Sequence, residues 1–433
     1  MKLIGSALLC VSALLFTSCD KKEKLPGKRE PIPGILQAEA PELGPSSMRS
    51  AVIVPPAITS LSRHVCTSGN KQHSAINHKM NPNGQRLSQI SIGSGPILTD
   101  LIAFGGNVYA IDANGILNCV SQKDCHPVWK KNIAEQPDDG VFSGGMTADE
   151  NGIIYVGTNI GTVFAIDSKN QKELWKKDLK VPMKGPPLCV TGKVIVTTVN
   201  NQTIALDIRN GEILWTKTVT QEPTMMSESS TPAVFGNSLI CAYPSGDVMS
   251  LNIDDGSDTW NDVLFPANMS QSGSTISHFS ASPVIWNGFV LVSMAEARMA
   301  LIDAITGTRS WDREIGTSST PAVIGNWAFI LNNDGSVTCI SLKDGRRKWV
   351  TDVKSACVDK NNALVGAKWI GPVIINGEIV VFNNAGHSVA LDISTGRIKK
   401  QRFFKGAQIV RTPIIIDGKL FALTERAELY VIG

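Results

Sequence analysis

Short apolar runs separated by polar turns make up most of the chain. The run from Gly161 to Asp167 is typical, because it passes into a polar turn and then reaches Trp175. Turns such as Asp344-Gly345 join runs of this kind, and such dipeptides favour β-hairpins. No stretch has the period of a long amphipathic helix. The pattern therefore predicts an all-β protein.

The spacing of glycine and tryptophan reveals an internal repeat. A tryptophan stands fourteen places after a glycine in several copies, and asparagine or alanine takes the first place in two others; the pairs are Gly115/Trp129, Gly161/Trp175, Asn201/Trp215, Gly246/Trp260, Ala297/Trp311 and Gly335/Trp349. In a seventh copy Lys400 occupies the tryptophan place. Two further apolar runs precede each copy, so each unit comprises four short strands. Four-stranded units of about 40 to 50 residues are typical of a β-propeller.

The number of units predicts how the ring closes. Seven copies are complete, and an eighth begins at Ile409 and reaches the C-terminus with only three strands. We expect residues 86–92 to supply its missing outer strand, because closure by both ends of the chain removes exposed sheet edges. The prediction is an eight-bladed propeller of four-stranded antiparallel blades, closed by an N-terminal strand. A tryptophan at one fixed place per blade indicates packing between blades, although stacking on a sugar or a quinone is the alternative.

The N-terminal residues have the features of a secretion signal. Lys2 precedes an apolar stretch that is too short to span a bilayer, and Phe16-Thr-Ser-Cys19 resembles a lipobox. We expect a signal peptide at 1–18, acylation of Cys19 with stable anchoring by its lipid chains, and a disordered tether rich in proline and lysine at 19–65. The propeller would then occupy 66–433. The alternative is an ordinary cleaved signal that happens to contain a cysteine.

Composition excludes some functions. The net charge of +3 and the absence of a basic stripe argue against a nucleic-acid partner. Without Cys10 and Cys19, seven cysteines remain, which is no disulfide framework. Buried thiols are the simplest interpretation, and a bond between Cys119 and Cys125 stays open. No cysteine or histidine spacing indicates a metal site, and no cofactor is expected.

The repeats resemble the tryptophan-docking repeats of the pyrroloquinoline quinone (PQQ) enzymes. Within that group the chain is similar to the BamB family, the lipoproteins of the outer-membrane β-barrel assembly machinery (BAM), in an alphaproteobacterial form. The segments that carry the resemblance are 68–73, 341–352 and 369–377. It implies a non-catalytic scaffold, anchored by lipid on the periplasmic face of the outer membrane. It also implies BamA, other BAM subunits and unfolded outer-membrane proteins as partners. Asp20, beside the anchor, leaves the choice between inner and outer membrane open.

The resemblance also indicates where a partner would bind. The family docks on BamA through two loops between blades, which correspond here to Met225-Met226-Ser227 and His278-Phe279-Ser280. The apolar side chains are kept, while the family's arginine and its acidic pair are replaced by Ser227, His278 and Ser280. These loops are therefore the expected partner-binding residues, with ordinary solvated connections as the alternative.

Two other functions occur on this fold. A PQQ-dependent dehydrogenase would need carboxylates around Ca²⁺ and commonly has two adjacent cysteines, and no two cysteines are adjacent here. Asp254 and Asp255 are explained by the hairpin turn in which they stand. A propeller that binds sugar or peptidoglycan stays an alternative, since fold alone does not decide function.

Overall fold

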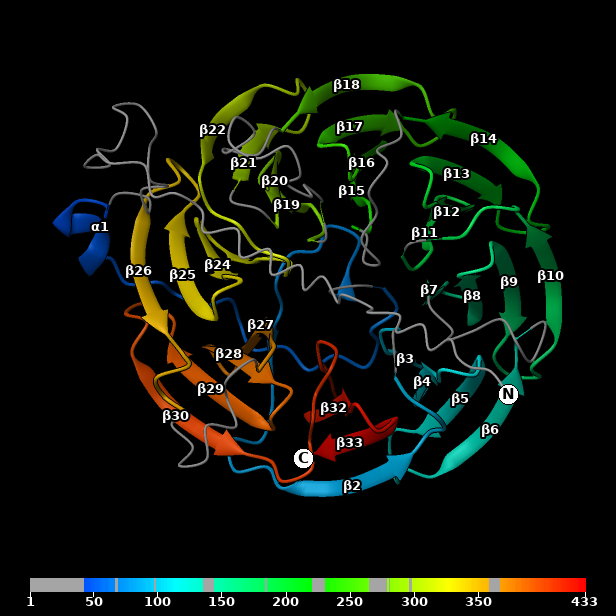
Figure 1. Cartoon of the computed structure of the whole chain (residues 1–433), viewed down its shortest axis with the longest axis horizontal. Coiled ribbons are helices and arrows are strands. Elements are labelled where there is room, and N and C mark those ends of the chain that lie inside the picture. The colour runs from blue at the N-terminus through cyan, green and yellow to red at the C-terminus, as the bar shows by residue number, and fades with distance from the viewer. Residues whose placement is uncertain are drawn as a thin grey trace, which may run out of the picture. The chain divides into compact units, whose positions relative to one another are not determined.

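The fold was analysed in a computed structural model, which describes residues 43–66, 69–96, 99–134, 144–183, 185–219, 230–264, 279, 281–295, 298–357 and 367–433. All of these belong to one compact unit that runs from Ala38 to Gly433. The unit is a ring of eight antiparallel sheets, as Figure 1 shows. The predicted all-β, eight-bladed propeller is confirmed.

Each of the first seven blades is a four-stranded meander, formed where apolar runs alternate with Gly- and Asp-containing turns. Blade 1 consists of β3 (Ile102–Phe104), β4 (Asn107–Ile111), β5 (Ile116–Ser121) and β6 (Pro127–Asn132). Blade 2 consists of β7 (Gly144–Ala148), β8 (Ile153–Thr158), β9 (Thr162–Asp167) and β10 (Glu173–Asp178). Blade 3 consists of β11 (Leu188–Val190), β12 (Lys193–Thr197), β13 (Gln202–Asp207) and β14 (Ile213–Thr218). Blades 4 and 5 are β15 (Ala233–Phe235), β16 (Ser238–Ala242), β17 (Asp247–Asn252), β18 (Asp258–Val263); and β19 (Val284–Trp286), β20 (Phe289–Met294), β21 (Arg298–Asp303), β22 (Arg309–Arg313).

Blades 6 and 7 complete the set of seven. They are β23 (Ala322–Ile324), β24 (Trp327–Leu331), β25 (Ser336–Ser341), β26 (Arg347–Asp352); and β27 (Trp369–Ile375), β28 (Glu378–Asn383), β29 (His387–Asp392), β30 (Ile398–Phe403). Blade 7 gains a fifth strand, β1 (Asn77–His78), which pairs in parallel with β27. In blade 4, for example, the first strand, β15, lies towards the centre and the last, β18, at the rim, as Figure 1 shows.

Blade 8 closes the ring with strands from both ends of the chain. It contains β31 (Ile414–Ile416), β32 (Lys419–Leu423) and β33 (Glu428–Ile432), and its outer strand is β2 (Arg86–Ser91). β2 pairs antiparallel with β33, with Arg86 opposite Ile432 and Ser91 opposite Glu428. The closing strand expected at 86–92 is therefore confirmed.

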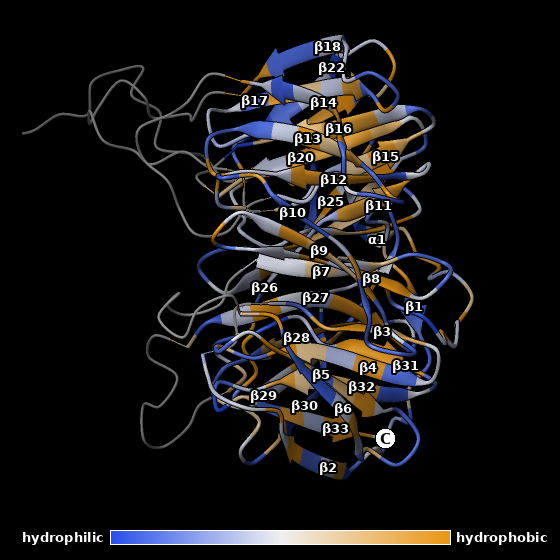
Figure 2. Cartoon of the chain, turned by 90° about the vertical axis from the view of Figure 1, so that its right-hand side faces the viewer, coloured by the Kyte–Doolittle hydropathy of each residue, from blue (hydrophilic) through white to orange (hydrophobic). Residues whose placement is uncertain are grey.

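The hydrophobic core is divided among the spaces between successive blades. The described residues form eight clusters of buried side chains, and each cluster joins two adjacent blades. Phe329 of blade 6 and Ile379 of blade 7, for example, share one cluster. Viewed from the side in Figure 2, apolar colours run along the strands and polar colours mark many of the turns. Each blade therefore depends on both neighbours for its buried surface.

Five of the repeated tryptophans, in blades 2 to 6, bind the next blade. Trp215 of β14 is buried, and its indole N–H donates a 3.0 Å hydrogen bond to the Ile253 carbonyl oxygen of blade 4. The next blade's turn glycine, Gly256, lies so close that an added Cβ would be 2.6 Å from the Trp215 ring. The same indole-to-carbonyl bond recurs at Trp175, Trp260, Trp311 and Trp349. The geometry supports the packing interpretation of these residues.

Residues 43–66 and 69–80, here called the strap, cross the ring before the first blade begins. The sequence predicted a disordered tether up to residue 65, and this boundary is wrong for residues 43–65, which lie against the blades. Ile53 is 3% exposed in the cluster between blades 6 and 7, and its N–H and carbonyl both bond the Ser394 hydroxyl. The many prolines and polar residues concealed this packing, because the strap buries isolated side chains rather than a periodic face.

Candidate functional site: the strap, the central channel and the rim

The strap begins at the outer edge of blade 6. The Gly44 N–H donates a 2.9 Å hydrogen bond to the Arg347 carbonyl oxygen on β26, and Leu43 forms a parallel bridge with the same residue. The short helix α1 (Ser46–Ser50) follows. The Lys348 ammonium donates hydrogen bonds of 2.7–2.9 Å to three strap carbonyls, those of Met48, Arg49 and Ala51. The strap thus occupies an edge that another strand would otherwise pair with.

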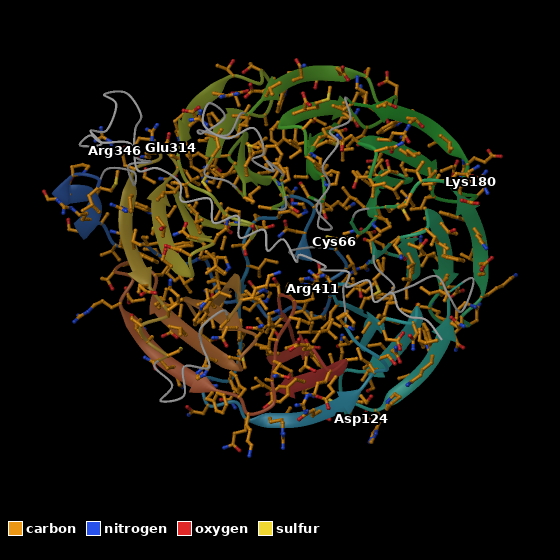
Figure 3. All side chains as sticks on the ribbon, in the orientation of Figure 1. Cys66, Asp124, Lys180, Glu314, Arg346 and Arg411 are labelled. Atoms are coloured by element: carbon orange, nitrogen blue, oxygen red, sulfur yellow. The ribbon has the colours of Figure 1, made fainter. Side chains whose placement is uncertain are left out.

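The strap then passes to the middle of the ring, where Figure 3 labels Cys66. In the described residues it hydrogen-bonds backbone of blades 1, 2, 4, 5, 7 and 8, at Ala103, Ala148, Val234, Ile285, Asn376 and Asp417. Together with Lys348 of blade 6, seven of the eight blades are tied to one segment. These contacts hold seven blades in fixed positions around the central channel.

A cavity of about 360 Å³ lies in the central channel under the strap. Its lining includes His64, His73 and His78 from the strap, together with serine and threonine residues and the backbone of β27. Each of these imidazoles has one buried ring nitrogen without a hydrogen-bond partner among the described residues, namely His64 Nδ1, His73 Nε2 and His78 Nδ1. The volume is within the range of small-molecule sites.

The three histidines are held in the neutral form. Burial lowers the pKa of His64 to about 3, with a further contribution from nearby His78. Burial also lowers the pKa of His73 and that of His78 to about 4, against the hydrogen bonds that they make with the backbone at Pro283 and Ile415. His73 Nδ1 lies 2.9 Å from the Pro283 carbonyl oxygen, so this nitrogen carries the proton. A neutral ring then offers Nε2 only as an acceptor.

The cavity lining does not fit a Ca²⁺-bound quinone. Within the described lining Asp100 supplies the one carboxylate. Across the described ranges, no group of three or more His, Cys, Asp or Glu residues is placed to hold a metal ion. Calcium is bound by six to eight oxygen ligands that usually include several carboxylates, whereas the described lining has one.

The predicted docking loops have different outcomes. Phe279, expected as an exposed anchor, is 1% exposed and packs in the cluster between blades 4 and 5 with Trp260 and Leu264. That expectation is wrong, because the side chain fills an interblade space that partner binding cannot reach. Met225, Met226, Ser227, His278 and Ser280 lie outside the described residues, as does the lipidation site Cys19.

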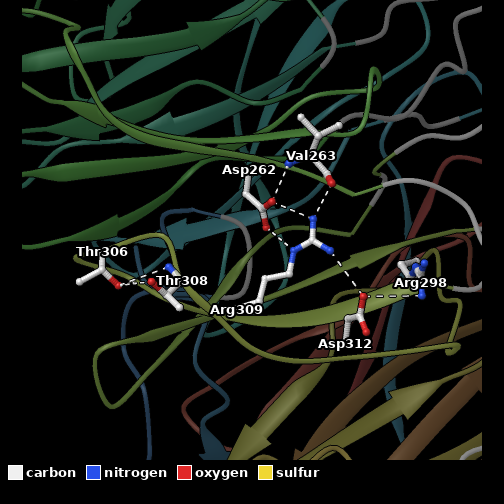
Figure 4. A network of polar contacts seen from close by, with 7 residues as sticks. All are labelled: Asp262, Val263, Arg298, Thr306, Thr308, Arg309 and Asp312. Atoms are coloured by element: carbon white, nitrogen blue, oxygen red, sulfur yellow. Dashed lines mark hydrogen bonds and ion pairs between the residues drawn. The ribbon is translucent and has the colours of Figure 1, made fainter.

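The acidic turn of blade 4 is structural. The Asp255 carboxylate accepts bonds from the Ser257 N–H and hydroxyl, and Asp254 pairs with Lys193 of blade 3 at 3.2 Å. Nearby, the Arg309 guanidinium of β22 forms a two-pronged contact with Asp262 of β18, including a 2.7 Å bond from Nη2 (Figure 4). The bonds of Asp255 are the turn chemistry expected here, and the two ion pairs join blade 4 to blades 3 and 5.

The cysteines are buried free thiols in the described ranges, at positions 66, 119, 125, 189, 241, 339 and 357. Cys119 packs between blades 1 and 2, while Cys125 packs between blades 8 and 1. The two thiols lie in different interblade clusters and are unpaired, so the disulfide bond left open by the sequence is not formed. Burial raises the pKa of Cys66 and that of Cys119 to about 11, which makes both thiols poor nucleophiles.

Comparison with known proteins agrees with this geometry. The family model described as "Outer membrane protein assembly factor BamB" matches residues 113–351. BamB of Escherichia coli is 23% identical over 79% of the chain and 87% of its own length. An uncharacterized protein of Rickettsia prowazekii is 24% identical over 65% of the chain and 69% of its own length, which fits the expected alphaproteobacterial type.

Solved structures are similar in fold. The crystal structure of BamB from Moraxella catarrhalis has a TM-score of 0.69 at 18% identity, covering 81% of this chain and 99% of its own. A europium-containing methanol dehydrogenase has a TM-score of 0.64 at 14% identity, over 86% and 89% of the two chains. Fold and repeat define the class as eight-bladed propellers with tryptophan-docking, PQQ-like repeats. Within that class, the chain belongs to the BamB family.

Proposed function

We propose that the chain is a non-catalytic scaffold of the outer-membrane protein assembly complex, which docks on BamA and assists insertion of β-barrel proteins. The observation that carries the proposal is the family match across residues 113–351, in the middle of a ring with the expected closure. Relatives of similar length, including those of Escherichia coli and Yersinia pestis, bear the name of outer membrane protein assembly factor.

The ring is suited to holding partners rather than to turning over a substrate. The outer strands of the blades present backbone groups at the rim, and an added strand can pair with such an edge. The edge of β26 already accepts the strap in this way. The large cores between blades make the ring a firm support for loops between blades.

Co-purification tests the role directly. A tagged chain would be isolated from envelope membranes, and BamA would be detected in the eluate. The role predicts that BamA co-purifies in stoichiometric amount, and its absence with the unaltered chain would contradict the role.

A loop variant tests the docking site separately. Met226→Asp should reduce BamA recovery, because truncating or charging an apolar anchor costs about 2 kcal/mol or more. Ile305→Asp, at a turn position that is 73% exposed in blade 5, is the matched control and should leave recovery unchanged. If both variants recover BamA normally, docking uses another surface.

We further propose that Cys19 is acylated and holds the chain at the periplasmic face of the outer membrane. Among the described residues, no helix is long and apolar enough to cross a membrane. Because the acyl chains are the anchor in this proposal, Cys19→Ala should move the chain to the soluble periplasmic fraction or leave an unprocessed precursor. Normal processing and unchanged fractionation would rule out lipidation. Density separation of the membranes decides between inner and outer membrane.

A further inference from the structure

The outer strand of blade 7 is unusual in charge. From Arg397 to Lys405 the chain carries five lysines and arginines and no acidic residue, the others being Lys399, Lys400 and Arg402. Four of the five are exposed, and Arg402 is half-buried. Between these cations, Phe403 is 60% exposed and Ile398 is 36% exposed. The strand therefore presents a cluster of positive groups with two exposed apolar side chains among them on the surface of the rim.

These cations are poorly neutralised. In the described part of the chain they form one ion pair, between Lys399 and Glu378 at 2.8 Å. Lys400 and Arg402 donate to the backbone carbonyls of Pro82 and Gly84, which leaves their positive charges unbalanced.

The acidic rim of blade 4 provides a contrast. The segment 254–262 has four aspartates and no lysine or arginine. Three of these carboxylates pair with cations of neighbouring blades, Asp254 with Lys193, Asp258 with Lys217 and Asp262 with Arg309. In Figure 1, β18 lies at the top of the ring and β30 at the lower left. Among the described residues, most of the positive charge at β30 has no opposite charge beside it, whereas most of the negative charge at β18 is paired.

The strap extends the apolar part of this surface. Ile53 contacts Ser394, in the turn that leads into β30, and this contact places its neighbours beside the same blade. Val52 and Val54 are each 79% exposed, although their neighbour Ile53 is buried. Together, Arg397 to Lys405 and the two valines form what is called here the basic rim.

We propose that the basic rim adsorbs to the surface of a membrane that contains anionic phospholipid. Cations near such a surface are attracted by its negative potential, and exposed aromatic and aliphatic side chains enter the headgroup region. An acidic protein would account for the cations but gives no reason for Phe403, Val52 and Val54 to stay exposed.

The strap's entry point is compatible with contact between the basic rim and a membrane. Leu43 joins the rim at β26, one blade away from β30. At about 3.5 Å per residue, the segment from Cys19 to Leu43 reaches at most roughly 80 Å. This argument rests on the proposed lipid anchor, whereas the chemistry of the basic rim does not.

Vesicle co-sedimentation tests the proposal. The chain from residue 20 onward, which contains the whole compact unit of residues 38–433, would be mixed with vesicles of phosphatidylethanolamine and phosphatidylglycerol or of phosphatidylcholine alone. We expect binding to the anionic vesicles that is at least tenfold stronger than to the neutral ones. Binding should weaken with added salt, because screening shortens the reach of exposed charges.

Variants then locate the binding surface. Arg397→Glu with Lys405→Glu should weaken binding by about tenfold or more, given the contribution of each cation near an anionic surface. Phe403→Ser should weaken it at high salt as well. The control Lys169→Glu with Lys172→Glu reverses two exposed charges on blade 2 and should bind normally. Circular dichroism would verify that each variant is folded.

Three outcomes would overturn the proposal: no binding by the unaltered chain, equal binding to both vesicles, or equal loss with control and rim variants. Measuring how much BamA co-purifies with the basic-rim variants distinguishes a failure of this proposal from a failure of the assembly role. A variant that loses vesicle binding but keeps BamA supports the basic rim alone. If BamA does not co-purify with the unaltered chain, only the assembly role is contradicted.

Discussion

The Lys400 ammonium donates a 2.7 Å hydrogen bond to the backbone carbonyl oxygen of Pro82, across the junction of blades 7 and 8. Lys400 stands where five earlier blades place a buried tryptophan whose indole N–H bonds the next blade. Those tryptophans pack against the turn between the third and fourth strands of the next blade. Blade 8 has no such turn, because its outer strand comes from the N-terminal part of the chain. A flexible cation reaches the carbonyl before β2 instead.

This substitution predicts unequal junctions. Lys400→Met should lower the free energy of unfolding by only about 1 kcal/mol, the usual net contribution of one hydrogen bond. Trp349→Ala removes a buried ring and should cost about 3–5 kcal/mol. Denaturant unfolding of the two variants measures the difference. Equal losses would show that Lys400 bears as much of the junction as a docked tryptophan does.

Two glycines with the same backbone angle separate strain from packing. Gly256 and Gly192 both have φ of +73°, but a Cβ at Gly256 would lie 2.6 Å from the Trp215 ring, while Gly192 has open space. Gly192→Ala should cost about 1 kcal/mol for the left-handed backbone. Gly256→Ala should cost a further 1–3 kcal/mol or so, because the ring must move. Similar melting temperatures for both variants would argue against tight tryptophan docking.

Acid should destabilise the ring through the strap. The pKa values of His64, His73 and His78 are lowered to between about 3 and about 4 in the fold, against 6.5 when unfolded. The unfolded chain therefore binds more protons, and stability that is present above pH 6.5 is lost as pH falls toward 4. Denaturant midpoints measured from pH 7.5 to 4.5 test this decline.

Variants identify the responsible groups. His64→Leu should flatten the dependence on pH, although it also lowers stability at neutral pH. His126→Gln alters an exposed histidine and should leave the slope unchanged. If His64→Leu leaves the slope of stability against pH unchanged, His64 does not contribute to the loss of stability in acid.

The strap should detach when its lysine clamp is lost. Lys348 is 3% exposed and holds three carbonyls of residues 48–51. Lys348→Met keeps the length of the side chain but removes its donors, so limited trypsin digestion should cut after Arg49 faster. Lys343→Met, in an exposed turn of the same blade, is the control. Equal cleavage rates for the two variants would show that other contacts hold the strap.

How far the sequence predicts this structure depends on periodicity. Strands, turns and closure followed from the repeat, since residues such as Gly246 and Trp260 recur at a fixed spacing in most of the units. The strap lacked such a signal, because Lys348 binds carbonyl groups that any residue offers. Phe279 was misassigned for a related reason, since only its neighbours in space show that it fills the core. The three strap histidines were also missed, as their cavity comes from several blades.

Ring closure also has a consequence for biogenesis. Gln89 of the closing strand bonds Glu428 at a separation of 339 positions, close to the far end of the chain. The thermodynamic cost of closing so long a loop grows only with the logarithm of its length. The length of the loop has a larger effect on the folding rate, because contacts between residues distant in sequence form slowly. Blade 8 therefore cannot be completed until the last strand has been synthesised, and until then β2 is an unpaired edge that needs protection from aggregation.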